Sequence, residues 1–134
     1  MVCIHCGSET HVINSRPQKR LNQVWRRRRC NTCQAVFTTE ETTQYQAVWA
    51  VRGLKNGVEP FSRDKLLLSV YKSCEHRKTA LEDARGLTDT IINKLRDRVV
   101  DGVLTRPVIT QVTQVSLNRF DGAASVHYAA FHAS

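Results

Sequence analysis

Four cysteines near the N-terminus form two Cys-x-x-Cys pairs, Cys3 with Cys6 and Cys30 with Cys33. Each pair can present two thiolates from one tight turn, and four thiolates are a ligand set that a structural zinc ion prefers. The stretch between the pairs is slightly longer than usual, which an inserted pair of strands can absorb. We therefore expect one structural zinc ion.

Other interpretations of these cysteines remain open. The pairs could be unligated thiols or a redox dithiol, although Gly7 and Gln34 follow them in turn-like sequence and redox dithiols usually begin a helix. His5 or His11 could also replace a cysteine as a ligand. A site closed by four protein ligands has no position open for water, so we expect it to shape the fold and not to catalyse.

Four consecutive arginines, Arg26, Arg27, Arg28 and Arg29, lead directly into the second cysteine pair. The run predicts a strand, whose alternation places Arg26 and Arg28 on one face and Arg27, Arg29 and Trp25 on the other. One pair can then bind the phosphates or a guanine edge of double-stranded DNA. A basic edge strand that resists aggregation is the alternative. Three residues of the preceding turn extend the basic patch: Arg16, Lys19 and Arg20.

The net charge of +8 points to a polyanionic partner. Residues 1–39 contribute +6 of it and residues 40–134 only +2, so the charge belongs to the cysteine-containing segment. No apolar run reaches the roughly 18 residues that would cross a bilayer. The basic segment has no apolar helical face to insert into a membrane surface. We expect a cytoplasmic protein without a membrane partner.

The chain changes character near residue 46. Residues 1–45 show no helical periodicity, and residues 14–17 have turn-forming composition, so this segment cannot bury enough apolar surface to fold alone. The stretches "QAVWAVRG" and "VEPF" then predict two strands around the turn Lys55-Asn56-Gly57. The sequence predicts an α+β protein: a small N-terminal β zinc ribbon, 1–45, followed by a mainly helical domain, 46–134.

About four helices are expected after the hairpin. Ser62 is a suitable N-cap for the first, and Thr79 with Glu82 forms a capping-box pattern for the second, which should end near residue 101. Pro107 suits the first turn of the third. Asp121-Gly122 separates it from a short fourth helix around residues 126–131.

Basic residues around the predicted hairpin could hold an anion. Arg52, Lys55 and Lys65 lie near the start of the helix that Ser62 caps, where free backbone N–H groups favour a phosphate. No Walker A or G-x-G-x-x-G pattern is present, and scattered lysines are usually a solvated face. Tyr128 and His132 could line a base or ribose, but they could also belong to the core.

The motifs "CIHCG", "INSRP", "RRRRCNTC" and "FTT", in this order, resemble the zinc ribbon of the NrdR family, bacterial transcriptional repressors of ribonucleotide reductase genes. The stretches "NGVEPFSRDKLLLSVYKSCEHR" and "HYAAFHAS" resemble the opening and the closing helix of the family's ATP-cone domain. The resemblance covers nearly the whole chain. It implies a repressor, not an enzyme, that senses ATP against dATP, forms nucleotide-dependent homo-oligomers and binds paired operator boxes in DNA.

Two departures from the family pattern bear on function. Arg29 abuts Cys30, whereas the family usually has one residue between its arginines and the third cysteine, which reverses the face of each arginine relative to the metal site. The family's Lys-Arg before the hairpin turn is here Leu54-Lys55. The second departure implies that one phosphate contact is missing or relocated. The first leaves open which pair of arginines contacts DNA.

A second function from another class is a nucleotide-sensing module that docks on a protein such as the reductase, with the ribbon as a structural clamp. Salt-insensitive DNA binding, or none, would favour it. The sequence contains no carboxylate pair, Ser-His-Asp set or open metal site that would indicate an enzyme.

Overall fold

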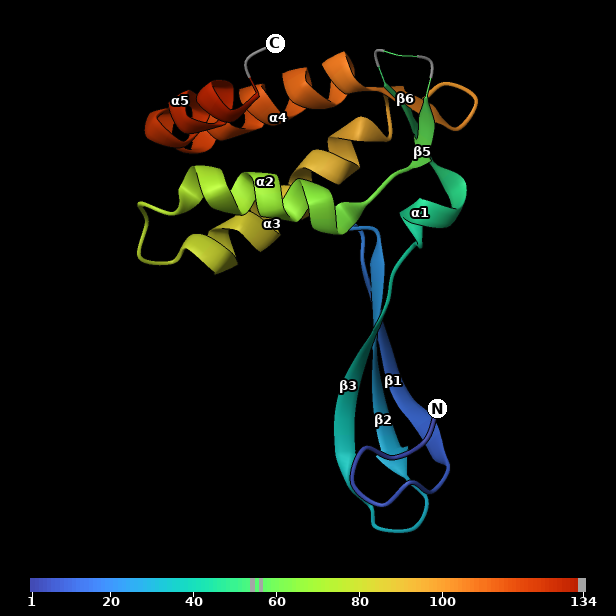
Figure 1. Cartoon of the computed structure of the whole chain (residues 1–134). Helices are drawn as coiled ribbons and strands as arrows, with labels where there is room; N and C mark the ends of the chain where they lie inside the picture. The colour runs from blue at the N-terminus through green and yellow to red at the C-terminus, as the bar shows by residue number, and fades with distance from the viewer. Residues whose placement is uncertain (54, 56, 133–134) are drawn as a thin grey trace. The chain divides into compact units, whose positions relative to one another are not determined.

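The structure is a computed structural model that describes residues 1–53, 55 and 57–132. The chain divides into two compact units, Met1–Thr43 and Gln44–Ser134 (Figure 1). The first is a β-sheet with the cysteine pairs at one end, and the second is mainly helical, so the protein belongs to the α+β class. The boundary predicted from the sequence, after residue 45, lies two residues beyond the one in the structure.

The first unit is an antiparallel sheet with strand order β1-β2-β3. Its strands are β1 (Thr10–Gln18), β2 (Gln23–Cys30) and β3 (Val36–Glu41). The arginine run forms the central strand, as predicted. The expected turn at residues 14–17 is wrong, because β1 passes through them. Pro17 is tolerated there because β1 is an edge strand, and proline, which lacks an N–H donor, is compatible with an edge strand but not with a central one.

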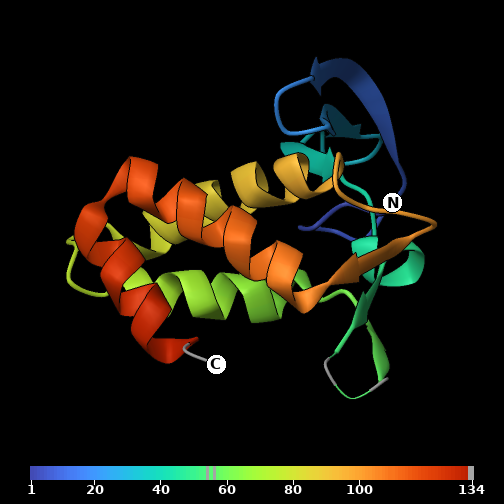
Figure 2. The ribbon, with the colours of Figure 1, turned by 90° about the horizontal axis from the view of Figure 1, so that it is seen from above.

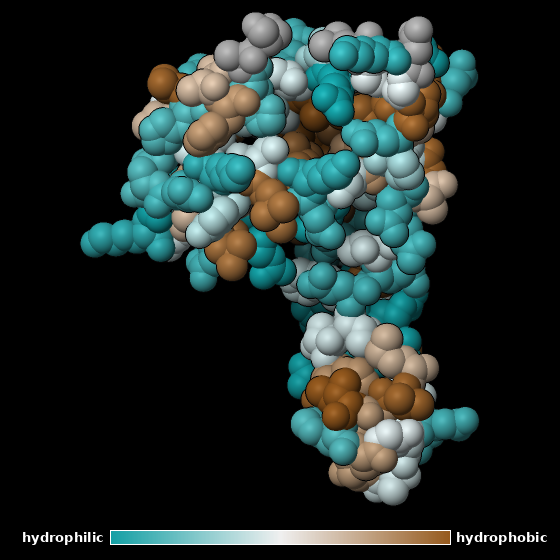
Figure 3. Space-filling model, viewed as in Figure 1, coloured by the Kyte–Doolittle hydropathy of each residue, from teal (hydrophilic) through white to brown (hydrophobic). Residues whose placement is uncertain are grey.

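The first unit has almost no apolar core. Among its residues only Cys3 and Cys30 are buried. Apolar side chains instead reach its surface, where brown patches lie among polar ones (Figure 3); the exposed set includes Met1, Val2, Ile4, Val12, Trp25 and Val36. Hydrophobic burial cannot hold this sheet together, so its stability must come from the cysteine end.

The second unit contains a small sheet of order β5-β4-β6. Its strands are β4 (Ala50–Arg52), β5 (Val58–Pro60) and β6 (Val103–Thr105). The predicted hairpin is the antiparallel pair of β4 and β5; Leu54 and Asn56 of its turn lie outside the described residues. β6, which the sequence pattern did not indicate, pairs parallel to β4.

A short helix replaces the expected start of the hairpin's first strand. It is α1 (Tyr45–Val48), and the ring centroids of Tyr45 and Trp49 lie 4.5 Å apart across its single turn. Trp49 also packs edge-on against Phe61, with 5.5 Å between the ring centroids. This i, i+4 aromatic contact explains why a strand-like sequence turns helical here.

Four longer helices build the core of the second unit. They are α2 (Arg63–Cys74), α3 (Ala80–Leu95), α4 (Arg106–Phe120) and α5 (Gly122–Phe131). α2 packs on α3 and α5, and α4 packs on the same two helices (Figure 2). Their shared core contains Val70, Cys74, Ile91, Leu95 and Leu117. No helix in the described part of the chain is long and apolar enough to span a membrane.

The helix ends confirm some predicted caps and correct others. Ser62 Oγ accepts a hydrogen bond from the Lys65 amide at 3.2 Å, as expected of an N-cap. The predicted capping box of α3 is wrong, because Thr79 Oγ1 donates to the Asp83 carboxylate at 2.7 Å and makes no cap bond. α3 ends at Leu95 instead of near residue 101. α5 begins at Gly122, earlier than the expected 126.

Candidate functional site

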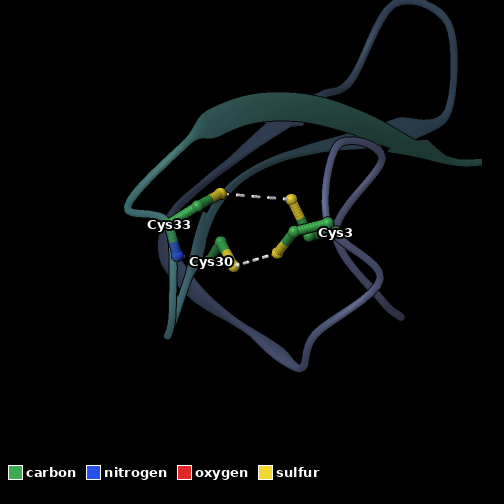
Figure 4. Close-up of side chains that lie close together, drawn as sticks. Cys3, Cys30 and Cys33 are labelled. Carbon is green, nitrogen blue, oxygen red and sulfur yellow. Dashed lines mark hydrogen bonds between the residues drawn. The ribbon is translucent and has the colours of Figure 1, made fainter.

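The four paired cysteines converge at one end of the first unit. Their sulfur atoms all lie within 4.8 Å of one another. Cys3 Sγ and Cys33 Sγ are 3.7 Å apart, and Cys6 Sγ and Cys30 Sγ are 3.4 Å apart (Figure 4). Four sulfurs placed tetrahedrally at about 2.3 Å from a zinc ion lie roughly 3.8 Å from each other. The cluster therefore fits one tetrahedral zinc ion.

Both cysteine turns have the same local design. The His5 amide donates to Cys3 Sγ and the Thr32 amide to Cys30 Sγ, each at 3.3 Å. The residue after each pair has a positive φ: Gly7 at 77° and Gln34 at 63°. Backbone donors that point at the sulfurs stabilise thiolates, as metal ligands require.

The thiol pKa values differ within the cluster. Hydrogen bonds from the side chain and backbone of Ser8 lower the pKa of Cys6 to about 6. The Ala35 amide lowers the pKa of Cys33, but burial and the three neighbouring thiols outweigh it and raise that pKa to about 11. Gathering four thiolates is thus unfavourable without a compensating cation, which a bound Zn²⁺ would supply.

The alternative ligands and chemistries fit less well. His11 Nδ1 is paired with Asn31 Oδ1 at 2.6 Å and is not part of the cluster. His5 is likewise outside the set of converging ligand atoms in the described residues. A redox dithiol needs only one pair, whereas here both pairs meet.

The sheet presents the four arginines on two faces, as the strand alternation predicts. Arg27 and Arg29 are exposed, and Arg26 and Arg28 are half-buried. Across the sheet, Arg27 pairs with Asn14 and Thr38, and Arg29 pairs with His11 and Val36. We call the side of β2 that carries Trp25, Arg27 and Arg29 the outer face.

On the opposite side, Arg26 is already occupied, and Arg28 is half-buried. Arg26 donates to Ser15 Oγ at 2.9 Å and forms an ion pair with Glu41 at 3.5 Å. The Nε atom of Arg28 is buried without a hydrogen-bond partner among the described residues. Arg27 and Arg29 are exposed and, like Arg28, have no ion-pair partner in the described part of the chain.

The three further basic residues do not share one turn. Arg16 lies in β1 and pairs with Trp25, which corrects its expected placement on the turn. Lys19 and Arg20 do occupy the turn between β1 and β2. Arg16 therefore joins the outer face, and the two turn residues lie at the end of the sheet opposite the cysteines.

The second unit contains a hollow of about 240 Å³ beside the start of α2. It brings together Lys65, Tyr128 and His132, three of the residues singled out from the sequence. Arg106, at the first position of α4, lines it as well and was missed, because the strand β6 that places it there was not predicted. Arg52 and Lys55 are not among its described lining residues.

The hollow has a charged side and an aromatic side. Glu59 pairs with Lys65 at 3.3 Å and with Arg106 at 3.5 Å, so both cations gather at one edge. Tyr128 and His132 also line the hollow, with their ring centroids 4.2 Å apart. Burial and the charge of Lys72 lower the pKa of His132, which favours the neutral ring. Such a hollow suits a planar ring that carries an anionic group.

Comparison with known proteins identifies the family. Residues 1–41 match the family described as "Transcriptional repressor NrdR-like, N-terminal domain". A transcriptional repressor NrdR of Symbiobacterium thermophilum is 39% identical over 98% of this chain and 87% of its own length. This chain belongs to the NrdR family. NrdR repressors of Geobacillus sp. (strain WCH70) and Thermosipho melanesiensis are 35% and 34% identical, over 82% and 87% of their lengths.

Membership in the NrdR family agrees with the site geometry. The matched segment ends with β3 and includes all four cysteines and all four arginines of β2. The cluster is therefore the metal site of a zinc ribbon. The family is one of repressors, not of enzymes, as the sequence indicated.

Proposed function

We propose that this protein is a zinc-dependent repressor that binds double-stranded DNA at paired operator boxes of ribonucleotide reductase genes, under the control of ATP and dATP. The observation that carries the proposal is the outer face of the ribbon. There a sheet held by the cysteine cluster exposes Arg27 and Arg29, which have no ion-pair partner among the residues that the structure describes, in a chain of a repressor family. Such a protein acts on the chromosome, so we expect it in the cytoplasm.

Arg27 and Arg29, with Arg16, are the proposed contacts to the operator. Because Arg26 is bound to Ser15 and Glu41, its guanidinium is less available to a phosphate or a guanine edge. Lys19 and Arg20 on the turn would add backbone contacts. Phosphate contacts supply most of the affinity and a few base contacts supply specificity, so binding should weaken steeply with salt.

Two double variants test this assignment. Arg27→Ala/Arg29→Ala should weaken specific binding roughly 10- to 100-fold and flatten the salt dependence by about 0.9 for each phosphate that is no longer neutralised. Arg26→Ala/Arg28→Ala removes the same charge from the other side and is the matched control. Fluorescence anisotropy at several salt concentrations measures both. An equal or larger reduction in affinity for the control would place the DNA on the opposite face.

The hollow beside α2 is the proposed nucleotide site. The adenine would lie against the exposed His132 ring, which packs on the buried Tyr128, and phosphates would replace Glu59 as the partner of Lys65 and Arg106. Backbone N–H groups at the start of α2 add to the same attraction. At about 240 Å³ the hollow is smaller than the roughly 300–1,000 Å³ of pockets that enclose whole ligands, so part of the nucleotide would remain outside.

Calorimetric titration with ATP and dATP tests this site. Lys65→Ala and Arg106→Ala should each weaken binding, because each removes a charge-assisted hydrogen bond to a phosphate. Lys78→Ala, an exposed lysine outside the hollow, is the matched control. Arg52→Ala and Lys55→Ala test whether these residues still reach the phosphates. Unchanged affinity in the first two variants would remove the nucleotide from this hollow.

Regulation would work through homo-oligomers of the second unit. ATP and dATP would favour different assemblies, and only some of these would place two ribbons at the spacing of the operator boxes. A nucleotide that binds all assemblies equally could not regulate.

A further inference from the structure

The outer face of the ribbon has a hollow of about 270 Å³ around Trp25. Five of its lining residues belong to the outer face, namely Asn14, Arg16, Trp25, Arg27 and Thr38, and the sixth is Arg26, whose guanidinium is held by Ser15 and Glu41. The register explains the grouping, because Arg16, Trp25 and Glu40 form one cross-strand row and Asn14, Arg27 and Thr38 form another. All three strands therefore contribute to one site.

Trp25 stacks on no other aromatic ring in the described part of the chain. Its side chain remains 40% exposed on the central strand of a sheet without an apolar core. An indole left open to water beside two guanidinium groups is a stacking platform next to an anion site. The same combination, an aromatic face with a basic border, is what proteins use to hold the bases of an unpaired strand.

The charged residues on the two sides of the hollow determine where a phosphate can bind. Arg16 lies beside Trp25 on β1, whereas Glu40 lies beside it on β3. A phosphate is attracted to the β1 side and repelled from the β3 side. In the second row, Asn14 and Thr38 offer an amide and a hydroxyl on either side of Arg27, which can meet the edge of a base.

We propose that this hollow is a subsite for a single nucleobase of DNA that has left the duplex stack, with Trp25 against the base and Arg16 on its phosphate. The proposal rests on the proposed DNA-binding function. Within an intact duplex the faces of the bases are covered and only their edges are reachable, so an indole in a hollow meets a base face only when that base is unstacked. The volume admits one planar ring system and not a whole ligand.

Fluorescence of Trp25 provides the direct test. The chain has two tryptophans, so Trp49→Phe leaves Trp25 as the sole indole. Operator duplex added to this zinc-loaded full-length protein should quench Trp25, because a stacked base quenches an indole. A duplex with 2-aminopurine at successive positions should brighten on binding where a base is unstacked.

Variants separate stacking from general binding. Trp25→Ala should weaken binding roughly 5- to 100-fold and abolish the 2-aminopurine signal. Trp25→Phe keeps an aromatic ring and should therefore retain most of the affinity and most of the signal. Val12→Ala removes exposed apolar surface from the opposite side of the same sheet and should change neither. Zinc content equal to that of the unaltered protein shows that the Trp25→Ala ribbon is folded.

The outcomes distinguish this subsite from the proposed function. Specific, salt-dependent binding with unchanged Trp25 emission, or with a silent 2-aminopurine at every position, would overturn the subsite and leave the repressor standing. Absence of specific binding by the unaltered protein would overturn both. Quenching together with position-dependent brightening supports the subsite.

Discussion

Asp121 connects the start of α5 with the segment between α2 and α3. Its carboxylate accepts from the Ala123 amide at 2.8 Å, which caps α5, and from His76 and Arg77, each at 2.9 Å. Arg77 in turn stacks over the Phe120 ring, 4.5 Å from its centroid. The hydrogen bonds from His76 and then Arg77 hold the pKa of Asp121 well below its usual range.

This pKa predicts how stability depends on acid. A depressed pKa in the folded state contributes stability above the unfolded value, about 3.9, and that contribution is lost as pH falls toward the folded pKa. Asp121→Asn should therefore lower the Tm clearly at pH 7 and by less at pH 3. Thermal melts followed by circular dichroism measure this difference, with Asp97→Asn, an exposed carboxylate in the turn after α3, as the control. An equal decrease at both pH values would contradict the role of the charge.

Among the helices and strands, the features that depend on residues close together in the sequence were predicted correctly. The arginine strand, the β4–β5 hairpin, the Ser62 cap and Pro107 in the first turn of α4 follow from neighbouring residues and are present. The strand β6 was missed because three residues carry no periodicity and its partner β4 lies far away in sequence. The hollow that contains Arg106 depends on that long-range pairing, so only part of its lining could be foreseen.

Cross-element contacts explain the remaining differences. The capping box at Thr79 fails because Asp83 is bound to Arg77, at 2.8 Å, and draws the threonine hydroxyl to itself. α3 ends early because residues after Leu95 make shorter-range bonds, such as that from the Asp97 amide to the Lys94 carbonyl. On the ribbon, the alternation of arginines was predictable, but the occupation of Arg26 by Ser15 and Glu41 needed the strand register.

At two glycines of the helical unit, substitution by alanine should change the stability in opposite directions. Gly86 lies inside α3 with nothing within 4 Å of an added Cβ, so Gly86→Ala should stabilise by about 0.5–1 kcal/mol. Gly102 has a φ of 74°, and an added Cβ would lie 3.2 Å from the Val48 carbonyl oxygen. Gly102→Ala should destabilise by about 1 kcal/mol or more.

Urea unfolding followed at 222 nm measures both changes, because the helices that give this signal belong to the second unit. A shift of the two midpoints in the same direction would show that backbone conformation does not govern these positions.

At the scale of the whole molecule, the two units depend on different sources of stability. The second has a continuous apolar core, whereas the first buries only two of its cysteines. A structural zinc site contributes on the order of 10 kcal/mol, which would replace the missing core. Metal and DNA binding are thereby linked, since the sheet that carries the arginines needs the ion.

Zinc removal should therefore act on one unit. A strong chelator should abolish DNA binding and expose the four cysteine thiols to a thiol reagent, and the helical signal at 222 nm should persist. The variant Cys33→Ser should likewise lose DNA binding and leave its three remaining cluster thiols reactive. Cys74→Ser, which alters the buried thiol of α2, should retain zinc and DNA binding. DNA binding that survives complete zinc removal would contradict the structural role of the ion.

In the proposed function, one chain couples DNA recognition to an adenine nucleotide. The most direct test is the fluorescence anisotropy of zinc-loaded protein on a labelled duplex from upstream of a ribonucleotide reductase gene, against a scrambled duplex, with no nucleotide, ATP or dATP. We predict specific, salt-sensitive binding whose affinity differs between the nucleotide states. Specific binding that is identical in all three states would contradict the coupling, and no specific binding in any state would contradict the repressor itself and favour a protein-docking module.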